Sequence, residues 1–235
     1  MLPKRYWYVI LTYLIMQFSS LPIALFVGSF FIDNYTDIMI YWSIFSFIAG
    51  LVVVLYLMKP DMQMRAHPEA ASISSVILWS ILGVLLAFFA QGIAASIEVY
   101  VLGIDPGSEN TMQIMDIARS NALFILIPAI VAPILEEIIF RKIIFGSLYK
   151  KMNFFLAALI SALIFGVVHM DLTHLLIYAA MGFVFAFLYV KTKRIIVPII
   201  VHAGMNTTVV LAQYSLTPEE IQKMLDEIQM IFFGF

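Results

Sequence analysis

Two adjacent glutamates, Glu136 and Glu137, lie in an apolar stretch that runs from Asn121 to Lys151. Ionisable side chains inside hydrocarbon are costly, so those that occur there are usually paired or functional. Arg141 follows Glu137 by four residues, a spacing that puts both on one helical face and allows a salt bridge. Glu136 lies about 100° further round the helix and needs another partner. We therefore expect Glu136 to centre a hydrolytic site; a structural ion-pair cluster is the alternative.

Two later apolar segments supply the polar residues that could complete such a site. His169 ends the first of them, and His202 and Asn206 share one face of the second at i,i+4 spacing. Counting about 1.5 Å per helical residue puts Glu136 and His169 at similar depths, about 20 Å from one membrane face. The same count puts His202 only about 10 Å deep, which is about two turns short of Glu136.

One glutamate, two histidines and an asparagine suit hydrolysis by water. A carboxylate and an imidazole can deprotonate a water molecule, and a histidine and an amide can donate hydrogen bonds to a developing oxyanion. Gly-x-Ser-x-Gly and His-Glu-x-x-His motifs are absent from the sequence. Two alternatives stay open: a zinc peptidase that uses Glu136, His169 and His202 as ligands, and a non-catalytic scaffold or immunity protein that binds a peptide in the same cavity.

The composition requires that these residues be held by membrane-spanning helices. The chain has 235 residues, of which 63% are hydrophobic and 12% charged, and its mean hydropathy is +1.01. Soluble domains are roughly 45–50% apolar and about 25% charged. The absence of cysteine excludes disulfides and thiolate sites, and nothing resembles a nucleic-acid-binding arm.

We predict an all-α, polytopic transmembrane bundle with about seven spans. The spans end near residues 32, 58, 102, 151, 170, 189 and 214, and we expect Ser19, Ser20 and Pro22 to kink the first. Between them we expect acidic loops at 33–37 and 104–116, a polar connector at 59–72 and a tight turn at 171–174. A short surface helix is expected over 217–230, since Thr217 can cap it. The chain is read as one domain, with accessory helices at 1–118, a catalytic core at 119–214 and an external tail at 215–235.

The positive charges predict the orientation. The N-terminus and the connectors at 59–72, 150–151 and 191–194 carry nine lysines and arginines, whereas the opposite side carries only Arg119 and Lys223. This positive-inside bias predicts a cytoplasmic N-terminus and an external C-terminus.

Weaker expectations concern other polar residues. His174 is expected in an external loop, where it could assist at the rim of the site. Glu98 and Gln91, in the third span, either line the cavity or cap its outer end.

The three motifs together resemble those of the CPBP family, the CAAX proteases and bacteriocin-processing membrane proteins (Abi, or type II CAAX endopeptidase-like). They are Glu136-Glu137-x-x-x-Arg141, Phe165-x-x-x-His169 and His202-x-x-x-Asn206, and they occur in this order within residues 119–214. Lys142 departs from the small residue that follows the arginine in many members.

The resemblance implies an intramembrane glutamate endopeptidase without a metal or other cofactor. It implies that Glu136 and His169 activate water, that His202 and Asn206 form the oxyanion site, and that Glu137 and Arg141 support them. The implied partners are the lipid bilayer and a peptide or protein substrate in or at a membrane, which we expect to be a bacterial cell membrane.

Overall fold

A computed structural model of the chain describes residues 3–65, 67–105, 107–216, 220 and 223. All regular elements of these residues are helical, which confirms the predicted fold class. Within this described part of the chain, six stretches are long and apolar enough to cross a membrane, and the helix Phe154–Val168 is a shorter apolar seventh. The expected surface helix at 217–230 lies almost wholly outside the described residues.

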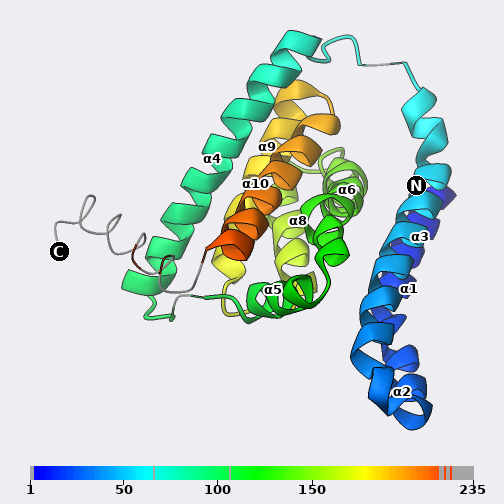
Figure 1. The fold of residues 1–235 in the computed structure, drawn as a ribbon. Helices are drawn as coiled ribbons and strands as arrows, with labels where there is room; N and C mark the ends of the chain where they lie inside the picture. The colour runs from blue at the N-terminus through cyan, green and yellow to red at the C-terminus, as the bar shows by residue number, and fades with distance from the viewer. Residues whose placement is uncertain (1–2, 66, 106, 217–219, 221–222, 224–235) are drawn as a thin grey trace.

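The N-terminal part is a helical hairpin (Figure 1). Helix α1 (Lys4–Phe18) is followed directly by α2 (Ser20–Phe30), and the helix is interrupted at Ser19, where a kink is expected. After the short 3₁₀ turn η1 (Ile32–Asn34), α3 (Tyr35–Gln63) returns alongside both.

Helix α3 continues past Met58 to Gln63, so the expected connector at 59–72 begins too early. Pro60 lies inside this last part of the helix. The carboxylate of Asp61 accepts hydrogen bonds from Arg5 Nε at 2.6 Å and from Tyr6 Oη at 2.7 Å. These bonds join the ends of α1 and α3, and sequence periodicity could not have shown them.

The remaining helices form the bundle that carries the motifs (Figure 1). Helix α4 (Ile73–Tyr100) packs against α9 (Leu175–Thr192) and α10 (Ile196–Ser215), and α8 (Phe154–Val168) packs against α9. Side chains cap two of these helices: the Ser72 hydroxyl accepts from Ser75 N, and the Asn153 amide oxygen accepts from Leu156 N.

The expected acidic loop at 104–116 is wrong in its second half. Helix α5 (Glu109–Ser120) begins there, and the Ser108 hydroxyl accepts a hydrogen bond from Thr111 N at its first turn. The helix is amphipathic: Met115 and Ala118 are buried, whereas Met112 and Arg119 are exposed. Its polar residues resemble a loop in composition, but the apolar ones recur at helical spacing.

The glutamate helix is built of unusual pieces. It comprises η2 (Ala122–Ile125, 3₁₀), η3 (Ile127–Val131, π), α6 (Ala132–Glu136), η4 (Glu137–Phe145, π) and α7 (Gly146–Leu148). It is the most buried of the long apolar stretches, and apolar side chains of the N-terminal hairpin, such as Val9 and Val54, share its core.

The connectors rich in positive charge converge at one end of the molecule. Besides the Arg5–Asp61 pair, Ala71 N donates to Thr192 O at 2.9 Å and Arg194 Nε donates to Ala71 O at 2.9 Å. This arrangement agrees with the expectation that the positively charged connectors share one side of the membrane. Which side of the membrane this end faces stays a prediction.

Candidate active site

The glutamates lie in a helix that contains two π-helical segments, Ile127–Val131 and Glu137–Phe145. A π-helix closes i→i+5 hydrogen bonds and is frequent at functional sites; it is wider than an α-helix and rises less per residue. Residues 137–145 therefore cover slightly less depth than α-helical counting assumes, but the difference is less than one turn. The contact of His202 with Glu136, which counting left about two turns short, therefore depends mainly on how the helices pack.

Polar side chains of neighbouring helices satisfy carbonyls that the irregular helix leaves free. Ser161 Oγ donates to Phe140 O at 2.8 Å, and Asn206 Nδ2 donates to Pro128 O at 3.0 Å. Pro133 contributes to the irregularity because it has no N–H for an intrahelical bond. The amide of Asn206 has a second N–H, and the residue lines the central cavity.

Glu137 holds two partners at once. Its Oε2 lies 3.2 Å from Arg141 Nε, so the predicted i,i+4 contact is present, and its Oε1 lies 2.9 Å from His202 Nδ1. Because a carboxylate only accepts, Nδ1 of His202 donates and the imidazole orientation is fixed. Glu137 and Arg141 are fully buried and His202 nearly so. Glu137 thus contacts a motif residue of another helix, which the sequence did not indicate.

The guanidinium of Arg141 is held mainly by charge and aromatic rings. Its nitrogens have no aligned hydrogen-bond partner among the described residues, although Nε is within ion-pair distance of Glu137. Its Cζ lies 4.6 Å from the ring centre of Phe165 and 5.2 Å from that of Phe185. Cation–π attraction of this kind is strongest where water is excluded.

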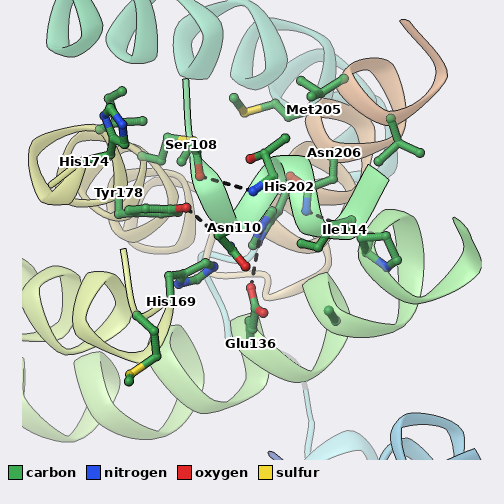
Figure 2. Close-up of a pocket in the computed structure, with 18 of the residues that line it drawn as sticks. Ser108, Asn110, Ile114, Glu136, His169, His174, Tyr178, His202, Met205 and Asn206 are labelled. Carbon is green, nitrogen blue, oxygen red and sulfur yellow. Dashed lines mark hydrogen bonds and ion pairs between the residues drawn. The ribbon is translucent and has the colours of Figure 1, made fainter. Parts of the chain in front are cut away.

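Glu136 faces His202 from the other side. Its Oε2 lies 3.7 Å from His202 Nε2, an ion-pair distance rather than a hydrogen bond. Figure 2 shows Glu136 facing His202. Since Glu137 bonds to the other ring nitrogen, His202 lies between the two carboxylates.

His169 lines the same cavity without an ion pair to Glu136 in the described part of the chain. Its Nδ1 lies 2.8 Å from Phe165 O, which can only accept, so Nδ1 carries a proton. In the neutral ring Nε2 is then an acceptor. The ring packs 4.4 Å, centre to centre, from both Phe165 and Tyr178.

A cavity of about 620 Å³ brings the motif residues together (Figure 2). Glu136, His169, His202 and Asn206 all lie on its wall, and no lysine or arginine does so among the described residues. Such a volume lies within the range of ligand pockets.

The chain resembles two proteins named as membrane proteases over almost its whole length. It is 50% identical to a Bacillus subtilis (strain 168) protein designated membrane peptidase YdiL, over 240 residues and 98% of both chains. It is 32% identical over 248 residues to the membrane-embedded CAAX protease MroQ of Staphylococcus aureus (strain USA300), again with 98% of both chains covered. The family model described as type II CAAX prenyl endopeptidase Rce1-like matches residues 118–208. The chain belongs to the Rce1-like CAAX protease family.

A shorter match, 37% identical over 78 residues, is to the UPF0177 protein YxdF of Lactococcus lactis subsp. lactis (strain IL1403). It covers 33% of this chain and 42% of that protein. No solved structure matches the chain significantly. The region matched by the CAAX protease model contains all seven residues named in the three motifs, from Glu136 to Asn206.

The cavity is also lined by residues outside 118–208, the region that the family model matches. Tyr13 of α1 is buried and lines the cavity, and its hydroxyl has no hydrogen-bond partner among the described residues. Glu98 and Gln91 of α4 line the cavity as well. This confirms the expectation that they line the cavity, which was one of two alternatives. A lone carboxylate in an apolar span was the available signal for Glu98.

His174 lies in the turn before α9, as the expectation of a loop residue at the rim of the site requires. It is buried, lines the cavity and forms an ion pair with Glu98, with Nδ1 and Oε2 2.7 Å apart. The two residues are 76 positions apart, which is why the sequence could not pair them.

The residues do not form the alternative zinc site. Among the described residues, no group of three or more histidine, cysteine, aspartate or glutamate side chains is arranged to hold a metal ion. One nitrogen of His202 is bonded to Glu137 and one of His169 to a carbonyl, and metal-bound histidines commonly make such bonds as well. The mechanism proposed below is written with the side chains of the chain and water.

Proposed function

We propose that this protein is an intramembrane endopeptidase that hydrolyses peptide bonds with a water molecule activated by Glu136. The observation that carries the proposal is the contact between Glu136 Oε2 and His202 Nε2 at the wall of the cavity. Membership of a peptidase family supports the reaction class, and the geometry supports the roles of the individual residues.

The charges of the buried cluster give the first argument. Glu136, Glu137, Arg141 and His202 are all buried, and arginine is always charged. Two carboxylates and one guanidinium leave one negative charge without balance, and an unbalanced charge in a low-dielectric site is strongly unfavourable. One additional proton restores neutrality, and Glu136 and His202 are the groups that can share it. A proton that two facing groups can exchange is what acid–base catalysis needs.

The order of proton transfers follows from the donors and acceptors. With His202 protonated and Glu136 ionised, Glu136 accepts a proton from water as the water oxygen attacks the peptide carbonyl carbon. The unprotonated Nε2 of His169 can orient the same water, since its Nδ1 is committed to Phe165 O. Glu136 then gives its proton to the leaving amide nitrogen as the carbon–nitrogen bond breaks, and the products are a carboxylic acid and an amine.

Two donors support the intermediate. His202 Nε2–H and the second N–H of Asn206 are available toward the cavity, because His202 Nδ1 and the first Asn206 N–H are already bonded to protein oxygens. Donors fixed in this way need no reorganisation when the oxyanion forms. Glu137 and Arg141 act through His202, as positioning residues.

The proposed substrate is a peptide or protein in or at the membrane. Side-chain amides of Gln17, Gln91 and Gln213 line the cavity, and amides can both donate to and accept from a peptide backbone that would otherwise be unsatisfied in hydrocarbon. The resemblance to bacteriocin-processing proteins and the CAAX protease name of MroQ make processing or immunity in a bacterial cell membrane the proposed setting. The proposed orientation has a cytoplasmic N-terminus and an external C-terminus.

The decisive test compares wild-type protein with Glu136→Gln in liposomes and in membranes. Purified protein is incubated with a peptide mixture, and cleavage is followed by mass spectrometry; peptides of cell membranes that carry either form are compared in parallel. We expect Glu136→Gln to lose about 10²–10⁴-fold in rate, while Glu69→Gln, at an exposed position in the connector, cleaves like wild type. Cleavage retained by Glu136→Gln would exclude the mechanism, and an unchanged cellular phenotype would favour the non-catalytic scaffold.

A further inference from the structure

A second buried pair of acid and imidazole lies on the wall of the cavity, apart from the motif residues. Glu98 is near the end of α4, and His174 is the residue before α9. Glu98 is 1% and His174 7% exposed, and both line the cavity that holds Glu136. The mechanism described above uses neither of them.

The hydrogen bonds of this pair define its protonation. His174 Nδ1 lies 2.7 Å from Glu98 Oε2, and His174 Nε2 lies 2.9 Å from Gly107 O. Glu98 Oε1 accepts from the backbone N–H groups of Leu176 and Ile177 at 3.1 and 3.2 Å. A carbonyl and an ionised carboxylate only accept, so both ring nitrogens of His174 must donate. The geometry therefore holds His174 as an imidazolium.

The charged surroundings agree with this assignment. The groups that face His174 are Glu98 from α4 and Asp171 from its own turn, both acidic, with the Gly107 carbonyl from the loop before α5. Burial by itself lowers the pKa of His174, but the hydrogen bonds to Glu98 and Gly107 outweigh it and raise the pKa above its ordinary value. No lysine or arginine lines the cavity among the described residues.

The imidazolium joins three segments around the site. Glu98 fixes the first turn of α9, Gly107 belongs to the loop that leads into α5, and His174 ends the turn that begins directly after His169. Gly107 has a φ of 116°, a conformation that favours glycine. The same loop and turn are joined again by Ser108 Oγ, which donates to Asp171 Oδ2 at 2.6 Å.

This connection also sets the position of α5 over the cavity. Ser108 caps α5, and Asn110 and Ile114 of that helix line the cavity (Figure 2). Thr111 and Met115 line it as well. Tyr178 of α9 packs against the ring of His169, with the ring centres 4.4 Å apart. The cover of the site and the position of His169 thus depend on the same few contacts.

We propose that Glu98 and His174 form a positioning pair that holds His169 and α5 in the geometry for catalysis only while His174 carries its second proton. The proposal rests on the proposed function of Glu136 and His169. A neutral imidazole has one N–H, so deprotonation of His174 beside ionised Glu98 costs the bond to Gly107 and frees the loop before α5. If Glu98 served only to cap the first turn of α9, this would explain the contacts of its Oε1 with Leu176 and Ile177. It would not explain the contact of its Oε2 with His174.

Glu98→Gln separates charge from geometry. The amide oxygen can accept the two backbone N–H groups, and the amide NH₂ can donate to the unprotonated Nδ1 of a neutral His174, whose Nε2–H still donates to Gly107. This variant keeps every bond while His174 is neutral. Glu98→Ala removes the bonds that join α4 to His174 and α9, and His174→Ala removes the bonds to both Glu98 and Gly107. The three variants form a matched set.

The first experiment measures cleavage rates in liposomes between pH 6 and pH 9.5. Glu98→Ala and His174→Ala should lower kcat/KM throughout, by about 10²-fold if His169 moves by about 1 Å. The ratio of Glu98→Gln to wild-type activity should rise with pH, because only the wild type loses the Gly107 bond. Parallel pH profiles for these two proteins, or wild-type activity in Glu98→Ala, would overturn the proposal.

The second experiment needs no catalysis and separates this proposal from the proposed function. Hydrogen exchange of residues 107–120 is compared among the variants at one pH, also in a Glu136→Gln background. Faster exchange in Glu98→Ala and His174→Ala than in Glu98→Gln is expected with either residue at position 136. Equal exchange in the three variants would overturn the positioning role even if Glu136 proves catalytic, and an inactive wild type with the expected exchange pattern would reject only the proposed function.

Discussion

His202 Nδ1 lies 2.9 Å from Glu137 Oε1, so the second glutamate of the pair holds a histidine of the last motif in place. The same carboxylate lies 3.2 Å from Arg141 through its other oxygen. Glu137 thereby links the charge of Arg141 to the ring that faces Glu136. The two adjacent glutamates have different partners because neighbouring helical positions point in directions about 100° apart.

Replacement of Glu137 by glutamine should lower the cleavage rate without removing the catalytic carboxylate. The amide oxygen can still accept a hydrogen bond from His202. With one negative charge removed, the charge of Arg141 balances that of Glu136, and the cluster no longer needs a proton on His202, which is then neutral. His202 Nε2 then no longer donates to the oxyanion, and kcat should fall about 10²–10³-fold. Steady-state cleavage assays check this, with Glu69→Gln as the exposed control. A kcat within threefold of wild type would contradict the role of Glu137.

Removal of Arg141 should destabilise the fold more than removal of the whole ion pair. Arg141→Met leaves the fully buried carboxylate of Glu137 without its charge partner, which costs about 3–5 kcal/mol. The double variant Glu137→Gln/Arg141→Met should recover part of this loss. Denaturant unfolding in detergent micelles measures both, and Arg119→Met, at an exposed arginine, serves as the control. No recovery in the double variant would show that aromatic packing of the guanidinium dominates.

Asn206 and its neighbour Thr207 offer a matched pair for the oxyanion site. Both donate to carbonyls of η3, Asn206 to Pro128 and Thr207 to Ala129, but of the two only Asn206 lines the cavity. Asn206→Ala should lower kcat about 10²–10³-fold, and Thr207→Ala should change it little. Equal losses in the two variants would indicate that the asparagine acts only by holding η3.

Close packing of α8 and α9 predicts an asymmetric effect of added methyl groups. A Cβ at Gly182 would lie 2.7 Å from Ala162 Cβ and 3.0 Å from Ala162 Cα, whereas a Cβ at Gly92 meets nothing within 4 Å. Gly182→Ala should lower the free energy of unfolding by about 1–3 kcal/mol through overpacking. Gly92→Ala should leave it unchanged or raise it slightly, since alanine favours helix. Thermal unfolding of both variants in detergent tests the difference; an equal Tm would contradict the close contact.

The sequence by itself determined the features that depend on local spacing and composition. Hydropathy predicted the all-α bundle and its apolar segments, Ser19 and Ser20 marked the break between α1 and α2, and the i,i+4 spacing paired Glu137 with Arg141. These inferences succeed because helix geometry fixes the relation between residues a few positions apart.

Only the tertiary structure decided which distant side chains meet. His202 Nε2 lies 3.7 Å from Glu136 Oε2, although counting at a fixed α-helical rise left the two residues about two turns apart. The bond between Glu137 and His202 spans 65 positions and that between Glu98 and His174 spans 76. Such contacts depend on how the helices pack, and a sequence pattern carries no direct measure of that packing.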